Sequence, residues 1–529
     1  MSIKILISDP LSEEGINILK IVEDFHVDIK TDLKPQELKE IIKDYDALIV
    51  RSATKVTKEI IDSSKNLKVI GRAGVGLDNV DLESATQKGI IVMNTPAGNT
   101  ISTAEHTFAL ILALSRNIPQ ANNSVKRGEW KRSQFMGVEL YNKVLAIIGL
   151  GRIGSEVAKR AQAFGMRVLA YDPYLRREIA QQLGVEIVEL RELLTESDYI
   201  TVHTPLTEET KHIISDEEFA LMKDGVRIIN CARGGVIDEK ALLNALKEKK
   251  VAGAALDVFE VEPPSKDSEL LKLDNVIVSC HLGASTEEAQ RNVAVEIAES
   301  VRDYLLGKGI RNAVNFPCLE IETYKVISPY LNLAERLGCF GAQIIEGRIQ
   351  EINLSYNGEI FNYDITPLTS ALVKGLLTPV LGDSVNFINA LSLAKERAIK
   401  LKETKSLREE EFINSIELKI NTDLESRSII GTLSSNKQPR IVKIDKYYVE
   451  VLPYGQMIIT YNWDRPGIIG NLGTLLGSHG INIAAMTFGR EEPQGKAISI
   501  LNVDNPISQD ILDKIKKLDN ILSVKLIKL

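Results

Sequence analysis

Cysteines and long apolar runs are scarce in this chain. Its 529 residues include four cysteines, and none of them stands in a CxxC pair or at the spacing of a Cys/His metal site. Neither a zinc site nor a disulfide framework is therefore expected. No run approaches the ~20 apolar residues that span a bilayer, and the first residues, MSIKILISDP, lack the apolar stretch of a secretory signal. We expect a cytoplasmic protein without a metal or a membrane partner.

Polybasic tracts are absent as well. The formal net charge is −8, with 26% charged and 44% hydrophobic residues, and this balance argues against nucleic acid as a partner. The length is sufficient for about three or four domains of ordinary size.

The most informative stretch is a glycine motif at the end of an apolar run, VLAIIGLGRIG at 144–154. A buried strand that turns there into a helix presents backbone N–H groups to a pyrophosphate. A second strand, 168–171, ends at Asp172, whose carboxylate can accept both ribose hydroxyls and repel a 2′-phosphate. The motif predicts a Rossmann domain that binds NAD rather than NADP; the alternative is a glycine turn in an unrelated α/β unit.

Short apolar strands alternate with amphipathic helices on both sides of this motif, which predicts parallel sheets covered by helices. Before the motif we expect strands at 3–8, 47–50, 68–71 and 90–94, and helices at 11–20, 37–43 and 57–64. After it we expect strands near 185–188, 199–203, 226–230, 252–256 and 276–280. Two long helices, 100–117 and 285–306, then act as crossovers around a cleft. The expected domains are a discontinuous flavodoxin-like substrate domain (1–99 and 283–317) and an NAD-binding Rossmann domain (100–282).

Residues 318–529 show a different order of expected helices and strands, and no group of residues suited to catalysis. Residues 318–455 read as an intervening α+β domain, with helices near 331–345 and 387–399 and strands at 416–420, 427–433 and 447–451. Residues 456–529 follow the order βαββαβ, which is typical of a ferredoxin-like unit.

Polar residues follow three successive strands of the predicted Rossmann domain. Arg233 follows the strand at 226–230, Asp257 and then Glu262 follow the strand at 252–256, and His281 follows the strand at 276–280. Because these strand ends lie on the same sheet edge as the glycine turn, the side chains converge near the nicotinamide. Such a trio predicts hydride transfer from a carbon that bears a hydroxyl. His281 takes the hydroxyl proton, Glu262 orients the imidazole, and Arg233 holds a carboxylate and polarises the developing carbonyl. Taken alone, His281 would more often be a helix-capping or core histidine.

Several of these motifs resemble one known family. GLGRIG, NCARGG at 230–235, ALDVFEVEPP at 255–264 and CHLGAST at 280–286 are similar to the D-isomer-specific 2-hydroxyacid dehydrogenases. With RSAT at 51–54, GRAGVGLDNVD at 71–81 and MNTPAGNT at 93–100, residues 1–317 resemble the members that oxidise 3-phosphoglycerate with NAD, the reaction that begins serine biosynthesis. Two alternatives remain open: a dehydrogenase for another D-2-hydroxy acid such as glycerate, and an NAD-sensing binding protein of the same fold.

The resemblance also implies site residues. The catalytic residues are Arg233, Glu262 and His281. The substrate contacts are Arg51, Ser52, Gly74 and Asn99, and by position alone Arg51 is equally a solvated loop cation. The cofactor contacts are Gly149, Gly151, Arg152, Ile153, Gly154, Asp172, Thr204, Cys231, Ala232, Arg233, Asp257, His281, Leu282, Gly283 and Ala284. Either Lys131 or Arg132 reaches the substrate of a neighbouring subunit.

The C-terminal part resembles regulatory domains that accompany these enzymes. DRPG at 464–467 and HGINIAA at 479–485 are similar to an ACT domain, and 318–455 resembles the intervening domain. ACT units are expected to meet between subunits through an open edge strand, in a homodimer or homotetramer. L-serine is the expected effector, bound by Asn462, Asp464 and Asn482. Some serine-sensitive relatives carry His and Asn on the first loop of the ACT domain, where this chain has Asn462 and Asp464. The alternative is therefore a unit that only holds the oligomer together.

Overall fold

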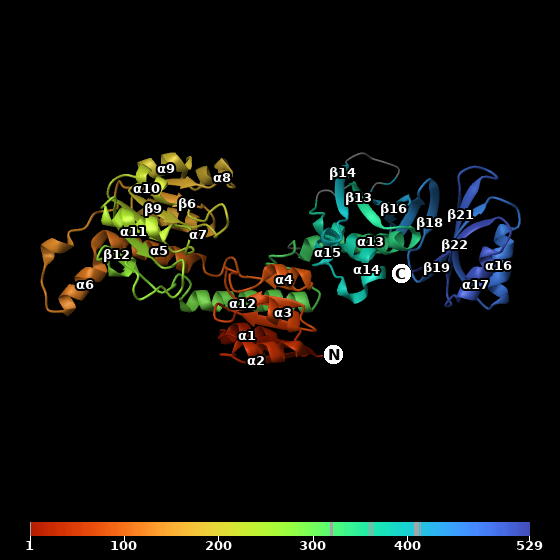
Figure 1. Ribbon diagram of the computed structural model, residues 1–529, viewed down its shortest axis with the longest axis horizontal. Coiled ribbons are helices and arrows are strands. Elements are labelled where there is room, and N and C mark those ends of the chain that lie inside the picture. The colour runs from red at the N-terminus through yellow and green to blue at the C-terminus, as the bar shows by residue number, and fades with distance from the viewer. Residues whose placement is uncertain (1, 318–320, 359, 361–362, 407–411, 413) are drawn as a thin grey trace.

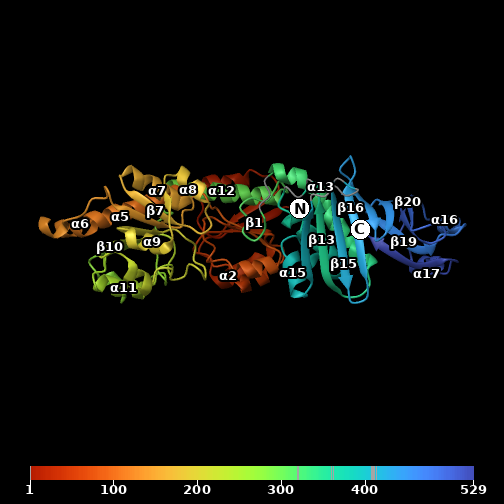
Figure 2. The ribbon, with the colours of Figure 1, turned by 90° about the horizontal axis from the view of Figure 1, so that it is seen from above.

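The computed structural model describes residues 2–317, 321–358, 360, 363–406, 412 and 414–529. Four sheets follow one another along an elongated molecule (Figure 1). The view from above shows the same succession, with the helices and strands between α5 and α11 at one end and the C-terminal helices α16 and α17 at the other (Figure 2). In the described residues no helix is long and apolar enough to cross a membrane.

The first sheet is parallel and has the order β2-β1-β3-β4-β5 of flavodoxin-like folds. Its strands are β1 (Ile3–Ile7), β2 (Phe25–Ile29), β3 (Ala47–Val50), β4 (Val69–Arg72) and β5 (Ile91–Met93), and its helices include α1 (Glu13–Lys20), α2 (Pro35–Ile41), α3 (Lys58–Ser63) and α4 (Leu82–Gln87). The predicted parallel sheet is confirmed. Strand β2 was not predicted from the sequence, because this edge strand is only half apolar and mostly accessible.

The second sheet is a seven-stranded parallel sheet with the order β12-β11-β10-β9-β6-β7-β8. Its strands are β6 (Val144–Ile148), β7 (Arg167–Tyr171), β8 (Glu186–Ile187), β9 (Tyr199–Val202), β10 (Val226–Asn230), β11 (Val251–Leu256) and β12 (Val276–Val278). The helices are α5 (Thr100–Arg116), α7 (Arg152–Ala163), α8 (Arg177–Gln182), α9 (Leu190–Glu196), α10 (Asp216–Leu221) and α11 (Glu239–Lys247). Successive residues of β6 enter two different cores, so helices cover both faces. The strand order reverses between β6 and β9, which opens a crevice at their carboxyl ends.

Helix α12 (Glu287–Leu305) returns from the NAD-binding domain to the first sheet (Figure 1). Its Val293, Ile297 and Val301 lie in the same core as β1 and β3. Glycine makes the close approach possible, because a Cβ at Gly71 would lie 2.9 Å from side-chain atoms of Ile297 and Val301. The first domain is therefore completed by a helix that lies about two hundred residues further along the chain.

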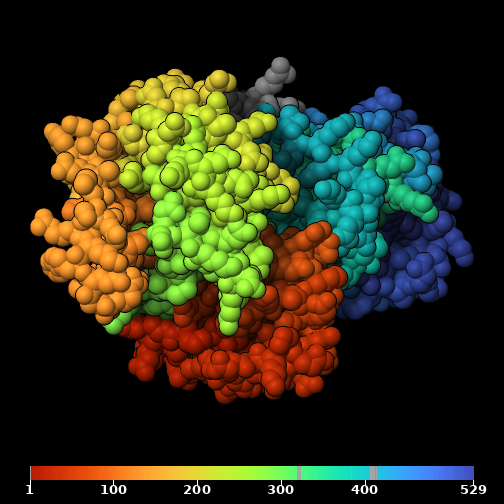
Figure 3. Space-filling view, turned by 60° about the vertical axis from the view of Figure 1, so that its left-hand side comes forward, coloured from red at the N-terminus to blue at the C-terminus, as the bar shows by residue number. Residues whose placement is uncertain are grey.

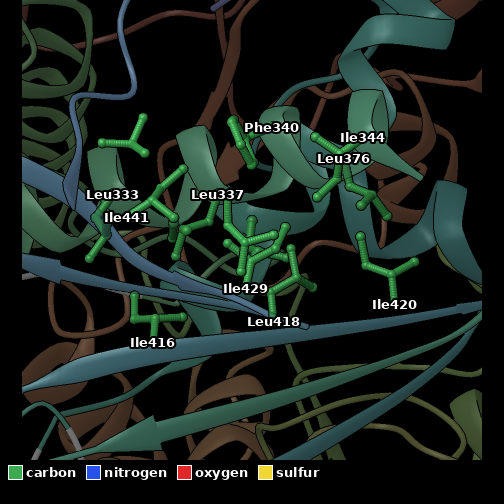
Figure 4. Packing of buried hydrophobic residues seen from close by; sticks show 14 of the residues in the cluster. Leu333, Leu337, Phe340, Ile344, Leu376, Ile416, Leu418, Ile420, Ile429 and Ile441 are labelled. Carbon is green, nitrogen blue, oxygen red and sulfur yellow. The ribbon is translucent and has the colours of Figure 1, made fainter. Parts of the chain in front are cut away.

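The third unit is a six-stranded mixed sheet with helices packed on it. Its strands are β13 (Ile349–Asn357), β14 (Lys400–Ser406), β15 (Ser415–Thr422), β16 (Ser426–Leu433), β17 (Pro439–Ile444) and β18 (Tyr447–Val451), and its helices are α13 (Ile321–Ile344), α14 (Thr366–Leu381) and α15 (Ala390–Glu396). Leucine, isoleucine and phenylalanine side chains of α13 face isoleucine and leucine side chains of the sheet (Figure 4).

Glycines bring α13 and α14 into backbone contact. A Cβ at Gly338 would lie 2.0 Å from the Leu372 carbonyl oxygen, and one at Gly375 would lie 1.9 Å from the Glu335 carbonyl oxygen. Helix α13 begins ten residues before the helix predicted from 331, so that boundary was wrong. Helix α14 was not predicted from the sequence, because this segment is apolar on nearly every side and carries no helical periodicity.

The last unit confirms the predicted βαββαβ order. It consists of β19 (Gln456–Trp463), α16 (Ile468–Ser478), β20 (Ile483–Arg490), β21 (Lys496–Val503), α17 (Gln509–Lys516) and β22 (Ile521–Lys528), in the sheet order β20-β21-β19-β22. One face of this sheet packs on α16 and α17. The other face contributes Met457, Ile459 and Ile498 to the core of the intervening domain. The two C-terminal units therefore share one hydrophobic core.

Candidate active site

Gly149, Gly151 and Gly154 lie at the turn from β6 to α7, and a different structural reason requires glycine at each position. Gly149 has a φ of +93°, which only glycine adopts without strain. A Cβ at Gly154 would lie 2.3 Å from the Gly149 carbonyl oxygen, so helix and turn pack tightly. A Cβ at Gly151 would meet nothing within 4 Å. This open side, together with the uncapped first turn of α7, leaves room for a pyrophosphate beside free backbone N–H groups.

Asp172 follows β7 and is held against this turn by backbone donors. Its Oδ2 accepts from the Leu150 N–H at 2.9 Å, and its Oδ1 accepts from the Tyr174 N–H at 3.0 Å. The carboxylate is thereby fixed at the side of the glycine turn. This is the position from which an acidic residue recognises ribose hydroxyls in this fold.

Two further groups along the crevice lack protein partners in the described residues. The Thr204 hydroxyl, just after β9, is buried without a hydrogen bond, although its methyl group lies beside Gly149. Nδ1 of the neighbouring His203 is also buried without a partner, and burial lowers the pKa of this histidine to about 4. A buried hydroxyl without a partner costs stability unless something else binds it. These groups therefore fit a dinucleotide laid along the crevice.

Cys231 and Ala232 begin the turn after β10. The Asn230 side chain shapes this turn, because it accepts from the Ala232 N–H at 3.0 Å and donates to the Arg233 carbonyl at 2.9 Å. Cys231 is 6% exposed, and burial raises its pKa to about 12. Its thiol is therefore neutral and suited to packing rather than to nucleophilic attack.

His281 and Glu262 are in direct contact. His281 Nδ1 lies 2.9 Å from Glu262 Oε2, and the other oxygen, Oε1, accepts from the Phe259 N–H at 3.2 Å. A carboxylate is an obligate acceptor when ionised, so the proton of a neutral imidazole is assigned to Nδ1 and Nε2 is the free acceptor. His281 has a φ of +58°, a conformation that is uncommon outside glycine and is often found at functional sites.

Asp257 holds the turn that carries His281. Its carboxylate is 1% exposed and accepts from the Leu282 and Gly283 N–H groups at 2.8 and 2.9 Å. The Ser279 hydroxyl donates to it at 2.6 Å, and His106 Nε2 lies 3.2 Å away. Burial by itself would raise the pKa of Asp257, but the hydrogen bonds from His106 and Ser279 outweigh it and the pKa is lowered.

His106 was not predicted from the sequence as part of the site. His106 and Thr103 lie three residues apart on α5, and the Thr103 hydroxyl donates to the Gly283 carbonyl at 3.1 Å. The i, i+3 spacing of two polar residues on an apolar helix was the available signal.

Arg233 reaches from the NAD-binding domain to the first domain. Its Nε lies 3.2 Å from Asp78 Oδ2, and a Cβ at Gly76 would lie 1.9 Å from its Nη2. Arg72, at the end of β4, lies on the same side of this cleft as Asp78. Burial and the charge of Arg233 lower the pKa of Arg72 to about 10, and its Nε is buried without a partner in the described residues.

Arg51 completes a group of three guanidinium groups at the cleft, since its charge also acts on Arg72. Its own backbone N–H donates to Asp9 at 2.5 Å and its Nη1 donates to the Pro10 carbonyl at 3.0 Å. Burial lowers the pKa of Arg51, and Asp9 partly offsets this. Arg51 was predicted from the sequence but Arg72 and Asp78 were not, because only the folded sheet brings these two residues to Arg233.

Of the other predicted substrate residues, Gly74 lies against this group. Gly74 has a φ of +144°, and a Cβ there would lie 1.5 Å from Arg72 Nη1, so glycine is what lets the guanidinium lie over the loop. Ser52 is exposed in the loop after β3. Asn99 precedes α5, and its Oδ1 is buried without a partner in the described residues.

The segment with Lys131 and Arg132 lies far from this cleft, next to the projecting helix α6 (Ile118–Lys126) (Figure 1). Lys131 pairs with Glu129 at 3.1 Å. Large apolar side chains are exposed along this arm: Ile118 (53%), Val125 (54%), Trp130 (79%) and Met136 (83%). These four side chains leave the arm with more exposed apolar surface than a short helix and loop usually have.

The predicted effector residues do not meet within one subunit. Asp464 precedes α16, accepts from Arg490 Nη1 at 3.1 Å, and so lies at the far end of β20. Asn482 follows α16 and donates to Asp504. The eleven residues of α16 separate the two by roughly 16 Å. Asn462 is 0% exposed and accepts from the Ser499 hydroxyl at 3.1 Å inside the domain.

The edges of the ACT sheet have neighbours in the same chain. Strand β20 lies beside β18, where the Glu450 N–H donates to the Thr487 hydroxyl at 3.2 Å. At the other edge, the Gln343 side chain pairs with the Lys528 backbone N–H and carbonyl at 3.0 and 2.9 Å. The open edge expected from the βαββαβ order is therefore partly covered.

The chain that carries this site is similar in sequence and in fold to known proteins. Residues 108–283 match the family described as D-isomer specific 2-hydroxyacid dehydrogenase, NAD binding domain. A crystal structure of D-lactate dehydrogenase from Aquifex aeolicus, complexed with NAD and lactic acid, is similar with 35% identity and a TM-score of 0.52, over 57% of this chain and 96% of that one. The fold and the site define an NAD-binding D-isomer-specific 2-hydroxyacid dehydrogenase.

Relatives along the whole chain narrow this class. The D-3-phosphoglycerate dehydrogenase of Methanocaldococcus jannaschii is 48% identical over 100% of both chains, and that of Bacillus subtilis is 44% identical over 99% of both. Residues 326–445 match the D-3-phosphoglycerate dehydrogenase intervening domain, and residues 457–520 match the ACT domain. The chain belongs to the D-3-phosphoglycerate dehydrogenase family.

Proposed function

We propose that this protein oxidises D-3-phosphoglycerate to 3-phosphohydroxypyruvate with NAD, the first step of serine biosynthesis. The observation that carries this proposal is the contact of His281 with Glu262, together with a group of three arginines that come from both domains. Full-length relatives named for this activity support it. A binding protein that only senses NAD has no need of a paired general base.

In the proposed reaction His281 is the general base. Its free Nε2 takes the proton of the C2 hydroxyl, and Glu262 stabilises the resulting imidazolium through Nδ1. Arg233 exchanges Asp78 for the substrate carboxylate and stabilises the developing carbonyl oxygen. Bound NAD supplies the acceptor for the hydride that leaves C2. The proton on His281 then returns to solvent, because the imidazole is 51% exposed.

Phosphate selectivity is assigned to the arginines of the first domain. A guanidinium pairs with a phosphate through two charge-assisted hydrogen bonds, and Arg72 has a buried N–H with no partner in the described residues. Ser52, Gly74 and Asn99 line the same wall and offer backbone and polar side-chain groups.

A comparison of two substrates tests this assignment. NADH formation from D-3-phosphoglycerate and from D-glycerate is measured for the wild type, Arg51→Ala and Arg72→Ala. We expect each variant to lower kcat/KM for phosphoglycerate by about 10²-fold, the worth of one charge-assisted pair at a desolvated site, and to change the value for glycerate much less. Equal losses with both substrates would show that these arginines bind a group common to both.

We further propose that the protein is a homo-oligomer. The exposed apolar side chains of the α6 arm suit a second copy of the chain, since they would be buried in an isologous contact. In that contact Lys131 or Arg132 approaches the cleft of the partner subunit.

L-serine regulation is proposed as a property of two ACT units. Because Asp464 and Asn482 lie at opposite ends of α16, two antiparallel copies of α16 would bring Asp464 of one subunit near Asn482 of the other. Gly470, Gly473 and Gly477 support such packing, because a Cβ at each would meet nothing within 4 Å. Asp464 then binds the ammonium group and Asn482 the hydroxyl or carboxylate.

Serine titration tests the effector site. Activity and oligomeric state are followed against L-serine in the wild type, Asn482→Ala and Gln509→Ala. We expect the first variant to raise the half-inhibitory concentration at least tenfold, while Gln509→Ala, on the exposed face of α17, responds like the wild type. Absence of serine binding to the wild type would contradict the proposal.

A further inference from the structure

The two halves of the chain meet at the corner between α4 and β5, residues 86–92. Three asparagine side chains from outside this corner donate to its backbone carbonyls. Asn386 Nδ2 donates to the Gly89 carbonyl at 2.7 Å, Asn389 Nδ2 to the Gln87 carbonyl at 3.3 Å, and Asn315 Nδ2 to the Ile90 carbonyl at 2.8 Å. Two of these donors come from the intervening domain, almost three hundred residues further along the chain.

The donors of the intervening domain sit on one turn, residues 386–389, which we call the docking turn. The Asn386 side chain accepts from the Ile388 and Asn389 N–H groups at 2.9 and 3.2 Å, and the Asn389 side chain accepts from the Asn386 N–H at 2.8 Å. The two amides therefore lock the turn and still direct one N–H each at the corner. Asn389 is only 2% exposed, which is expected for a satisfied interface group rather than for a solvated loop.

An apolar side chain of the docking turn, Ile388, accompanies these hydrogen bonds, and we call it the plug. Ile388 is 8% exposed and belongs to the core of the first domain, together with Phe316. Its neighbour Phe387 packs against the cores of both halves, and Lys374 of α14 lies 4.3 Å from its ring centroid. One side chain of the intervening domain thus completes a core of the catalytic half.

A pocket adjoins these contacts. A cavity of about 360 Å³ lies beside the docking turn, between Tyr304 and Ile310 of the first domain and Leu331 of α13. The junction between the intervening and ACT units is different, because those two units share one continuous core. A tightly packed core resists movement, whereas a small plug beside a cavity can separate locally. In the space-filling view the first domain touches both the NAD-binding domain and the intervening domain (Figure 3).

The corner is also directly connected to the active site. Strand β5 pairs with β4, where Met93 lies opposite Gly71, immediately before Arg72. The residues after β5 lead to Asn99 and the crossover helix α5, and the Thr95 N–H donates to the Gly74 carbonyl at 3.0 Å. A change in how the corner is held therefore acts on the loops that carry the substrate arginine and the domain hinge.

We propose that the docking turn is the coupling contact through which the intervening and ACT units, moving as one body, act on the catalytic half. The contact itself is independent of any effector; that it transmits a serine signal rests on the function proposed above. Undocking frees the corner 86–92 and loosens the wall of the cleft that holds Arg72.

Hydrogen exchange measured by mass spectrometry on the full-length protein tests the contact from both sides. Ile388→Ala removes the plug, and Val385→Ala is its control, because Val385 is buried within the intervening domain only. We expect amides in 86–93 and 304–317 to exchange at least tenfold faster in Ile388→Ala, and at the wild-type rate in Val385→Ala.

Gly89→Ala perturbs the contact from the other side. A Cβ there would lie 2.1 Å from Asn386 Nδ2, with φ at +75°, whereas Gly225→Ala has the same backbone strain at +84° and nothing within 4 Å. We expect Gly89→Ala alone to speed exchange in 384–392. If neither Ile388→Ala nor Gly89→Ala changes exchange across the junction, the docking turn is not a coupling contact.

Activity measurements separate this inference from the proposed function. A wild type that forms no NADH from D-3-phosphoglycerate contradicts the proposed function and leaves the exchange result to decide on the contact. If the wild type is active and inhibited by serine, Ile388→Ala should lose at least half of that inhibition. Full inhibition in a variant that exchanges faster at the corner would overturn the coupling role.

Discussion

Replacement of Glu262 tests the catalytic pair most sharply, because its two oxygens have separate partners. Oε2 faces His281 Nδ1 at 2.9 Å and Oε1 accepts from the Phe259 N–H at 3.2 Å. Glu262→Gln keeps the shape but has only one acceptor oxygen. The amide must therefore give up either the imidazole or the loop N–H, and it also loses the charge that faces the imidazolium formed during the reaction.

The magnitude follows from distance and exposure. Two unit charges about 4 Å apart interact by roughly 1 kcal/mol in water and about 4 kcal/mol at an effective dielectric constant of 20. Because the side chains of His281 and Glu262 are 51% and 39% exposed, we take the lower part of this range, about 1–2 kcal/mol. This corresponds to a loss of roughly 5- to 30-fold in kcat for Glu262→Gln. Glu262→Ala also leaves the imidazole ring of His281 without an orienting partner, and we expect it to lower kcat by about 10²–10³-fold. His281→Ala removes the general base itself, and we expect it to lower kcat by about 10²–10⁴-fold.

The assay is steady-state NADH formation at saturating D-3-phosphoglycerate, with NADH binding followed separately by fluorescence. Glu260→Gln is the matched control, because this carboxylate lies on the same loop but pairs with His212 at 3.2 Å. We expect the control to stay within twofold of the wild type and all variants to bind NADH normally. Equal losses in Glu262→Gln and Glu262→Ala would refute the orienting role, and wild-type turnover in His281→Ala would refute the general base.

Two further predictions concern the cofactor crevice. Asp172→Ala removes the acid that repels a 2′-phosphate, so the ratio of kcat/KM for NAD to that for NADP should fall at least tenfold; an unchanged ratio would count against a ribose contact. The buried Cys231, whose pKa is raised to about 12, should resist a maleimide at pH 8 while the exposed Cys280 reacts. Peptide mapping distinguishes them, and rapid labelling of Cys231 in the folded protein would contradict its packed, neutral state.

Local patterns explain why much of the fold could be predicted. Strand β6 is fully apolar and β9 and β10 are mostly apolar, because helices cover both faces of a parallel sheet, and this makes them visible as short apolar runs. The half-exposed β2 and the uniformly apolar α14 were missed, because neither carries the periodicity that sequence reasoning uses. The start of α13 was missed for a related reason, since the apolar stripe strengthens only from Leu331 onwards.

The candidate site also contains residues that the sequence predicts and residues that only the structure shows. The glycine turn, Asp172 and the ends of β10, β11 and β12 are local features of strand–turn–helix units, so their residues were named from the sequence. Arg72, Asp78 and His106 were not, because their roles depend on which strands and helices lie side by side. The separation of Asp464 from Asn482 likewise depends on the length and direction of α16 within the folded unit.

The sequence by itself determined most of the elements, their order and the chemistry at each strand end, because backbone turns and apolar periodicity depend on neighbouring residues. Only the tertiary structure decided which of these residues face one another. It placed Arg233 opposite Arg72 across a cleft, completed the first domain with α12, and seated Ile388 in a core almost three hundred residues away. Such contacts join segments that lie far apart along the chain. Local sequence periodicity does not indicate them, because only the packing of complete cores brings the segments together.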